Sequence, residues 1–216
     1  MVIWTPQPKQ AEFMQRAEDE VLYGGAAGGG KSEALVCEAL RQVHLPFYRA
    51  CIFRKTYPQL EEIISKSHRY YKAAFPAAKY NETKHVWTFP SGAKIYFRSM
   101  AHKNSYLQYQ GLSFEYIGFD ELTHFTREEY EYLLSRNRAN GPGARVYIRA
   151  TANPGGIGHG WVKERFIDAL EPRVAKEFEA EVRTPDGKAV KTKKTRVFIP
   201  ASVFDNRILM ENDPGY

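Results

Sequence analysis

Residues 25–32 read Gly25-Ala26-Ala27-Gly28-Gly29-Gly30-Lys31-Ser32, which fits the pattern G-x-x-x-x-G-K-[ST]. In such a loop, glycines let backbone N–H groups converge on phosphate oxygens, the lysine adds a positive charge and the serine hydroxyl serves magnesium. A helix that starts at Lys31 would add the positive end of its dipole. The alternative is a flexible glycine loop that contains Lys-Ser by chance. We predict that residues 25–32, with the adjacent Glu33, bind the phosphates of ATP.

The pattern around this loop predicts an α/β fold. Strands are expected over residues 20–23, 49–54, 84–89, 94–98, 114–119 and 144–150, and helices over residues 7–20, 31–43, 59–74 and 127–138. Residues 84–89 and 94–98 alternate apolar with polar around Pro90-Ser91-Gly92, which indicates a hairpin. Because strands alternate with helices, we expect a mostly parallel sheet flanked by helices, decorated by hairpins.

The last forty or so residues have a different pattern. Residues 178–183 and 195–199 flank Pro185-Asp186-Gly187, a second hairpin-type turn. We therefore divide the chain into an ATPase core, residues 1–175, and a late hairpin with the start of a linker region, residues 176–216. This hairpin carries a basic run, consisting of Lys188, Lys191, Lys193, Lys194 and Arg196. The run could contact DNA phosphates or protect the edge of a strand, and the sequence leaves both readings open.

Two adjacent carboxylates end an apolar segment, Tyr116-Ile117-Gly118-Phe119-Asp120-Glu121. ATP hydrolysis needs one carboxylate for magnesium and another group that orients the attacking water. We predict that Asp120, together with Ser32, holds magnesium. Glu121 is then the general base. Because successive side chains of a strand point to opposite faces, the pair requires a turn at the strand end. The alternative is an Asp-Glu cap on the helix near Thr126. A glutamate directly after the metal aspartate favours the motor type of P-loop NTPase, with an additional central strand, over a small-molecule kinase.

The composition limits the class of protein but does not identify a partner. The chain has 216 residues, 43% of them hydrophobic and 26% charged, as in an ordinary globular protein. Its net charge of +6 is compatible with a polyanionic partner but does not require one. No segment reaches the length of about 18 apolar residues that suggests a membrane span, and the N-terminus has no signal-peptide pattern. Cys37 and Cys51 are expected to be reduced and buried.

Several segments together resemble the large terminase subunit of tailed bacteriophages. They are residues 23–32, Phe119-Asp120-Glu121 and Thr151-Ala152-Asn153-Pro154-Gly155, in that order and at that family's approximate spacing. The opening Pro6-Gln7-Pro8-Lys9-Gln10 resembles the adenine-reading segment, and Phe53-Arg54-Lys55-Thr56 the end of the second strand. Ser202 with Asp205-Asn206 resembles the stretch where the ATPase domain meets its linker. The resemblance covers almost the whole chain.

This resemblance implies a DNA-packaging motor that uses ATP and Mg2+. In the family, several copies form a ring on the portal of an empty capsid and drive double-stranded DNA inward. The implied partners are double-stranded DNA, the portal of the procapsid and the small terminase subunit, and the implied place is the cytoplasm of an infected bacterium. By the same likeness, Gln10 would contact adenine, while Thr151 and Asn153 would couple hydrolysis to movement. The alternatives are helix initiation for Gln10 and a plain turn for residues 151–155.

Two departures from the family pattern matter. Full-length members carry a nuclease domain with clustered acidic residues, whereas the aspartates after Asn153 are scattered, so we expect an ATPase domain without DNA cleavage by this chain. The phosphate loop also lacks an arginine before Lys31, although some members have one there. A charge-stabilising arginine must then come from elsewhere. Arg54 is the first candidate, followed by Arg136 and Arg138, acting within the chain or in a neighbouring subunit; each could also be an ordinary ion-pair arginine.

Two other functions remain open from the sequence. The first is another nucleic-acid translocase or helicase-like ATPase, although an arginine-rich helicase signature and a second lobe are not visible. The second is a non-hydrolysing nucleotide-binding assembly module. The intact set of Lys31, Ser32, Asp120 and Glu121 argues against the second, because degenerate sites usually lose one of these residues.

Overall fold

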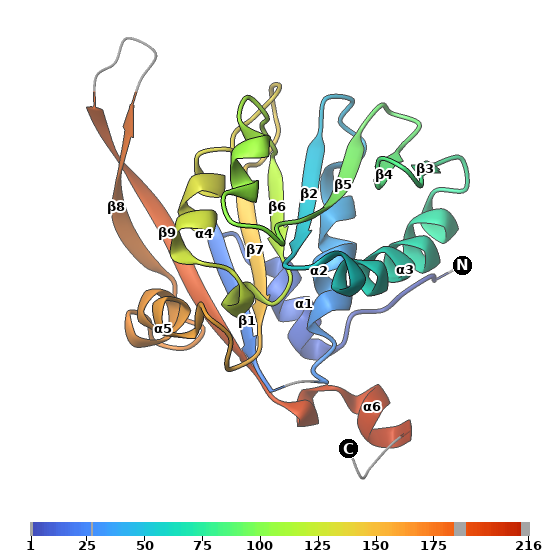
Figure 1. Ribbon diagram of the computed structural model, residues 1–216. Helices are drawn as coiled ribbons and strands as arrows, with labels where there is room; N and C mark the ends of the chain where they lie inside the picture. The colour runs from blue at the N-terminus through green and yellow to red at the C-terminus, as the bar shows by residue number, and fades with distance from the viewer. Residues whose placement is uncertain (1, 27, 184–188, 213–216) are drawn as a thin grey trace.

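One sheet forms the centre of the molecule. The computed structural model describes residues 2–26, 28–183 and 189–212. The strands in this part of the chain are β1 (Glu20–Gly25), β2 (Arg49–Arg54), β3 (Lys79–Asn81), β4 (Val86–Thr88), β5 (Lys94–Ser99), β6 (Tyr116–Phe119), β7 (Tyr147–Ala152), β8 (Lys176–Arg183) and β9 (Ala189–Ala201). They join in the order β3-β4-β5-β2-β6-β7-β1-β9-β8, as Figure 1 shows. The strands from β5 to β9 in this order are parallel, whereas β3, β4 and β8 pair antiparallel.

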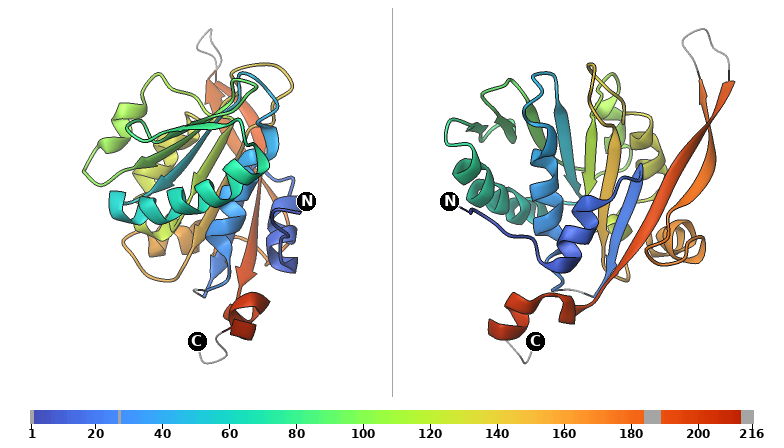
Figure 2. Two further views of the ribbon diagram at one scale, coloured as in Figure 1. Left: turned by 90° about the vertical axis from the view of Figure 1, so that its right-hand side faces the viewer. Right: turned by 180° about the vertical axis from the view of Figure 1, so that it is seen from behind.

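Helices cover both faces of the sheet. The longer ones are α1 (Pro8–Gln15), α2 (Lys31–Glu38), α3 (Tyr57–Ala74), α4 (Arg127–Leu134) and α6 (Arg207–Asn212), with α5 (His159–Val162) a single turn. Short helical turns are η1 (Ala39–Gln42), η2 (Ser105–Tyr109), η3 (Leu122–His124), η4 (Lys163–Asp168) and η5 (Val203–Asp205). Figure 2 shows α1, α2 and α3 on one face, and α4 and α5 on the other. The result is a three-layer α/β architecture.

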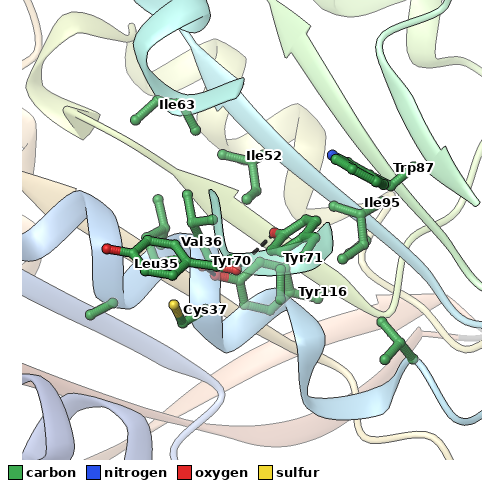
Figure 3. Close-up of a cluster of buried hydrophobic side chains, with 14 of the residues drawn as sticks. Leu35, Val36, Cys37, Ile52, Ile63, Tyr70, Tyr71, Trp87, Ile95 and Tyr116 are labelled. Carbon is green, nitrogen blue, oxygen red and sulfur yellow. Dashed lines mark hydrogen bonds between the residues drawn. The ribbon is translucent and has the colours of Figure 1, made fainter. Parts of the chain in front are cut away.

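The strand alternation divides the hydrophobic core into two clusters. In β2, Ala50 and Ile52 face α2 and α3, whereas Cys51 and Phe53 face the α4 side. Figure 3 shows the first cluster, in which tyrosine rings fill the space between α2, α3 and the sheet. The hydroxyl of Tyr71 donates to the carbonyl of Val36 over 2.8 Å, so this buried polar group is satisfied. The tyrosine contacts thereby fix the helix that follows the glycine loop.

The structure confirms the predicted fold class. The parallel sheet, its flanking helices and the hairpin of β4 and β5 are all present. Strand β7 lies between β1, which leads into the glycine loop, and β6, which leads into the two carboxylates. This inserted strand is the additional strand expected of the motor type. Cys37 and Cys51 are buried free thiols, as expected. Among the described residues, no helix is long and apolar enough to cross a membrane.

Several elements differ from the predictions. The helix expected over residues 127–138 ends at Leu134, that over residues 31–43 continues as η1 after Glu38, and β3 was not predicted. The helix expected over residues 7–20 ends at Gln15, because Arg149 takes the carbonyl groups of Arg16 and Glu18 as hydrogen-bond acceptors. Strand β9 is longer than expected and belongs to two pairings. Its first part pairs with β8, and its last six residues pair in parallel with β1. The predicted turn at Pro185-Asp186-Gly187 and the neighbouring Lys188 lie outside the described residues.

The described part of the basic run is paired with carboxylates. Lys191 contacts Glu179 and Lys193 contacts Glu177 across the hairpin, at 3.0 and 2.7 Å. The ammonium group of Lys194 lies 2.8 Å from the carboxylate of Asp19. These pairs place Lys191 and Lys193 on a solvated face of the hairpin, and a contact of the run with DNA stays a prediction.

Glu20 joins four elements at the start of β1. Its carboxylate accepts hydrogen bonds from the Tyr130 hydroxyl at 2.7 Å, from Arg165 at 2.9 Å and from Arg196 at 3.0 Å. All three partners come from different elements, namely α4, η4 and β9. Because the carboxylate is buried, it needs the two arginines and the tyrosine hydroxyl to offset its desolvation. This network sets the position of the strand that carries the glycine loop.

We expect Glu20→Gln to destabilise the fold by about 3 kcal/mol, because the change leaves two arginines without their buried counter-charge. Glu179→Gln removes a matched carboxylate from the exposed face of the hairpin and should cost less than about 1 kcal/mol. Urea unfolding of both variants measures the difference. Equal losses would contradict the assigned role of Glu20.

Candidate nucleotide-binding site

The glycine loop lies at the carboxyl end of β1, where ligands of parallel sheets collect. Gly25 has a φ of +143°, and a Cβ atom there would lie 1.9 Å from the carbonyl oxygen of Ala201. Gly30 has a φ of +68°, and its Cβ atom would lie 2.7 Å from Nε2 of Gln10. These two positions therefore require glycine. Helix α2 starts at Lys31, directly after the loop, as the pattern predicts.

Lys31 is directed back over the loop. Its ammonium group is mostly buried and donates a hydrogen bond to the carbonyl of Ala26 at 2.5 Å. Burial lowers the pKa of Lys31, and the nearby charges of Glu121 and Asp120 oppose this shift. A ligand with further negative charge would favour the protonated lysine in the same way. The geometry thus suits an anion at the loop.

The buried carboxylate of Asp120 connects three strands and a helix. Its Oδ1 atom accepts a hydrogen bond from the Ser32 hydroxyl at 2.8 Å and another from the Thr151 hydroxyl at 2.6 Å. Its Oδ2 atom lies 2.7 Å from Nε of Arg54, which stands at the end of β2. The angles of this last contact are not those of a hydrogen bond, and neither atom has another partner within the described residues. Asp120 therefore holds an ion pair and one oxygen with spare acceptor capacity.

Glu121 adopts a left-handed backbone conformation, with a φ of +58°. This conformation is rare for residues other than glycine and provides the turn that the adjacent carboxylates require. The backbone N–H of Asn153 donates to Oε2 of Glu121 at 2.9 Å, and its side-chain amide donates to Oε1 at 2.5 Å. The N–H of Glu121 in turn donates to the Thr151 hydroxyl at 3.1 Å. The Asp-Glu pair and residues 151–153 are thus one hydrogen-bonded unit.

Gln10 contacts the glycine loop and caps its own helix. Its Oε1 atom accepts from the N–H of Gln7 at 2.8 Å, while its Nε2 atom donates to the carbonyl of Gly30 at 2.8 Å. The bond to the N–H of Gln7 agrees with helix initiation by Gln10, whereas its contact with adenine stays a prediction. Gln7 also binds Asn206, whose amide donates to the carbonyl of Gly28. The stretch around Asn206 thus contacts the outer side of the loop.

The remaining predicted residues are placed as follows. Glu33, in the first turn of α2, accepts a hydrogen bond from the Tyr70 hydroxyl at 2.6 Å. Arg54 is only 9% exposed and points to Asp120 in its own chain rather than outward. Arg136 packs over the ring of Tyr132, 5.4 Å from its centroid. Ala27 lies outside the described residues.

Comparison with known proteins identifies the family. The sequence profile described as "Terminase large subunit, T4likevirus-type, N-terminal" matches residues 22–216. The chain belongs to the large terminase subunit family. This confirms the resemblance that the motifs predicted. A search of curated proteins found no match.

Solved terminase structures share the fold. The large terminase of a thermophilic bacteriophage matches 96% of this chain and 50% of its own, with a TM-score of 0.65 and 19% identity. The same terminase has been solved in complex with ADP, with a TM-score of 0.62, 19% identity and coverage of 95% and 48%. The large terminase ATPase domain of Thermus phage P74-26 matches over 97% of this chain and 86% of its own, with a TM-score of 0.65 and 14% identity. This terminase chain therefore spans about half the length of the first of these proteins and has the fold of a terminase ATPase domain.

We expect Thr151→Val to destabilise the protein by about 1–3 kcal/mol, because valine keeps the shape but removes a hydroxyl that serves both Asp120 and Glu121. Thr151→Ser keeps the hydroxyl and should recover most of this loss. Urea denaturation of the two variants and the wild type gives the comparison. If valine and serine were equally stable at this position, the hydroxyl would not hold the unit together.

Proposed function

We propose that this terminase chain is the ATPase motor domain of a phage packaging machine, hydrolysing ATP to drive double-stranded DNA into a procapsid. One observation carries the proposal. Ser32 at the start of α2 and the adjacent pair Asp120-Glu121 after β6 meet beside the glycine loop, and these are the residue types that ATP hydrolysis needs. Membership of the terminase family favours DNA packaging over other translocase roles.

The residues of the site fit ATP with magnesium. The loop offers converging backbone N–H groups and Lys31 for the phosphates. Ser32 and Asp120 are the oxygen ligands, direct or through water, that would hold magnesium, and Oδ2 of Asp120 has acceptor capacity to spare. When bound there, magnesium would neutralise charge on the phosphates. Gln10 stands at the loop, where we assign it to the adenine edge, although its amide must then exchange one of its present partners.

We assign Glu121 as the general base. Its carboxylate accepts a proton from the water that attacks the γ-phosphorus, while the leaving ADP takes the bond electrons. The two hydrogen bonds from Asn153 fix the orientation of this carboxylate. A change at the γ-phosphate that moves Glu121 must therefore move Asn153 as well. This link supports a coupling role for Thr151 and Asn153, which stand at the head of the loop that follows β7.

We further propose that Arg54 supplies the charge-stabilising arginine within its own subunit. Its guanidinium is buried beside Asp120 and cannot reach another chain without leaving the site. Because the contact of Arg54 with Oδ2 of Asp120 lacks hydrogen-bond geometry, its guanidinium is free to turn toward phosphates bound at the glycine loop. The arginine would then stabilise the charge that develops during phosphoryl transfer.

The wider assembly follows from the family alone. We propose a homo-oligomeric ring at the portal, with double-stranded DNA as the cargo and the small terminase subunit as a partner. The place of action is then the cytoplasm of an infected bacterium. A non-hydrolysing assembly module is the second candidate function, and the following experiment separates the two.

Glu121→Gln should retain ATP binding but reduce turnover by about 100-fold or more, because the amide cannot accept the proton of the attacking water. Steady-state phosphate release and the Kd of a fluorescent ATP analogue give the two readouts. Glu129→Gln is unsuitable as a control because Glu129 is buried against Lys55, so the exposed Glu131→Gln is used. Equal turnover in wild type and Glu121→Gln would remove Glu121 as the base.

Mixing inactive variants tests whether Arg54 acts within its own chain. Arg54→Ala should lower turnover by about 1,000-fold. Lys31→Ala keeps Arg54 but loses the phosphate-binding ammonium. If Arg54 serves its own subunit, a mixture of the two variants stays inactive at every protein concentration, whereas an arginine donated to a neighbour would restore part of the activity. A mixture of Arg138→Ala with Lys31→Ala tests in the same way whether the exposed Arg138 acts on a neighbouring subunit.

A further inference from the structure

A cavity of about 400 Å³ lies on α3 and the β3–β4 corner, and shares no residue with the nucleotide site. Strand β3 is one edge of the sheet and β8 is the other, so the cavity and the late hairpin lie at opposite sides of the molecule (Figure 1). Six lining residues carry an aromatic ring, an imidazole or a carboxylate, and these are Tyr57, Glu61, His68, Tyr80, Glu82 and His85. None of the described lining residues is a lysine or an arginine.

The rings of this cavity support one another. The rings of Tyr57 and His85 are 5.1 Å apart between centroids, and those of His68 and Tyr80 are 4.6 Å apart. The Tyr80 hydroxyl and Nδ1 of His85 lie within 3.2 Å, which joins the two pairs. Trp87 packs behind His68 and Tyr80, with centroid distances of 5.0 and 5.2 Å. The wall is therefore preorganised, so a ligand need not order it on binding.

His85 reaches this wall through a strained backbone. Its φ is +45°, a value that costs free energy for a residue other than glycine and persists only where the surroundings hold it. Arg98 provides part of this support, because its guanidinium donates to the carbonyls of Lys84 and Phe97, both at 2.8 Å. The strained backbone places the imidazole ring of His85 between Tyr57 and Tyr80. With a negative φ at this position, the side chain would point in another direction.

The charged side chains that line the cavity are two carboxylates, in a chain of net charge +6. Glu61 and Glu82 are exposed, and within the described residues neither forms an ion pair. Burial and then the charge of Glu82 raise the pKa of Tyr80 to about 12, whereas the charge of Arg98 lowers it. The cationic group behind the wall, Arg98, is occupied by backbone carbonyls and by the ring of Tyr96. Tyr57, which is 42% exposed, leaves its ring available at the opening.

We propose that this cavity binds an arginine side chain presented by a partner protein. A guanidinium is planar, so it stacks on the tyrosine and imidazole rings while its edge donates to the carboxylates of Glu61 and Glu82. An ammonium group is more strongly hydrated and has no flat face, so lysine fills the same cavity less well. An anionic or apolar ligand would leave both carboxylates without a counter-charge.

The test uses blocked tripeptides and the whole chain labelled with ¹⁵N. The peptide acetyl-Gly-Arg-Gly-amide is titrated while the amide signals of residues 57–68 and 80–87 and the imidazole signals of His68 and His85 are followed. We expect saturable shifts confined to these residues. The matching Lys peptide should bind several-fold more weakly, and the matching Glu peptide should cause no saturable shift.

Two sets of variants address the carboxylates and the ring. Glu61→Gln with Glu82→Gln should weaken binding of the Arg peptide by at least about tenfold, because two charge-assisted hydrogen bonds are lost. Glu171→Gln changes another exposed glutamate outside the cavity and should leave the Kd unchanged. Tyr57→Phe should keep most of the affinity, whereas Tyr57→Leu should lose several-fold, since only phenylalanine retains the ring face. Dispersed amide spectra verify that each variant is folded.

Three results would overturn the proposal. The first is no saturable shift with the Arg peptide. The second is unchanged affinity in the double glutamine variant. The third is tighter binding of spermidine than of the Arg peptide, which would indicate a free polyamine instead of a protein side chain.

Discussion

The buried carboxylate of Asp120 is the constraint on which the site depends. A charge without water must be matched by nearby donors and cations, or the group would become neutral or the fold would loosen. Here Ser32, Thr151 and Arg54 meet that requirement, and they come from α2, β7 and β2. A single carboxylate therefore fixes the lateral positions of the loop helix and two strands. Any ligand that binds Asp120 therefore weakens its contacts with Ser32, Thr151 and Arg54.

Glu121 adds a second constraint beside the first. Its left-handed backbone turns the side chain away from the direction that a continued strand would give it, and Asn153 holds the carboxylate from both oxygens. Strain of this kind persists only where the surrounding hydrogen bonds determine the conformation. The hydrogen bond from the N–H of Glu121 to Thr151 and the two hydrogen bonds from Asn153 hold this conformation. The end of β6 and the end of β7 thus behave as one structural unit, and neither can shift alone.

The sequence predicted those features that rest on local patterns. The glycine loop, the helix after it, the apolar strands and the order of the motifs were all readable, because each depends on residue types at short spacing. The need for a turn between Asp120 and Glu121 also followed from strand geometry. The contact of Arg54 with Asp120 could not be predicted, since it depends on which strands become neighbours. For the same reason, the end of α1 at Gln15 followed from Arg149, which lies more than 130 positions later in the chain.

Strand β9 has a mechanical consequence. It is shared between the outer hairpin and the sheet, since it pairs with β8 over its first part and with β1 from Arg196 to Ala201. Its last residue lies against Gly25, where the glycine loop begins. A pulling force along β9 would act parallel to β1 and shear the hydrogen bonds between these two strands. In this geometry all of these hydrogen bonds resist the force together instead of breaking one after another. A displacement of the β8–β9 hairpin would therefore be transmitted along β9 to the start of the phosphate loop.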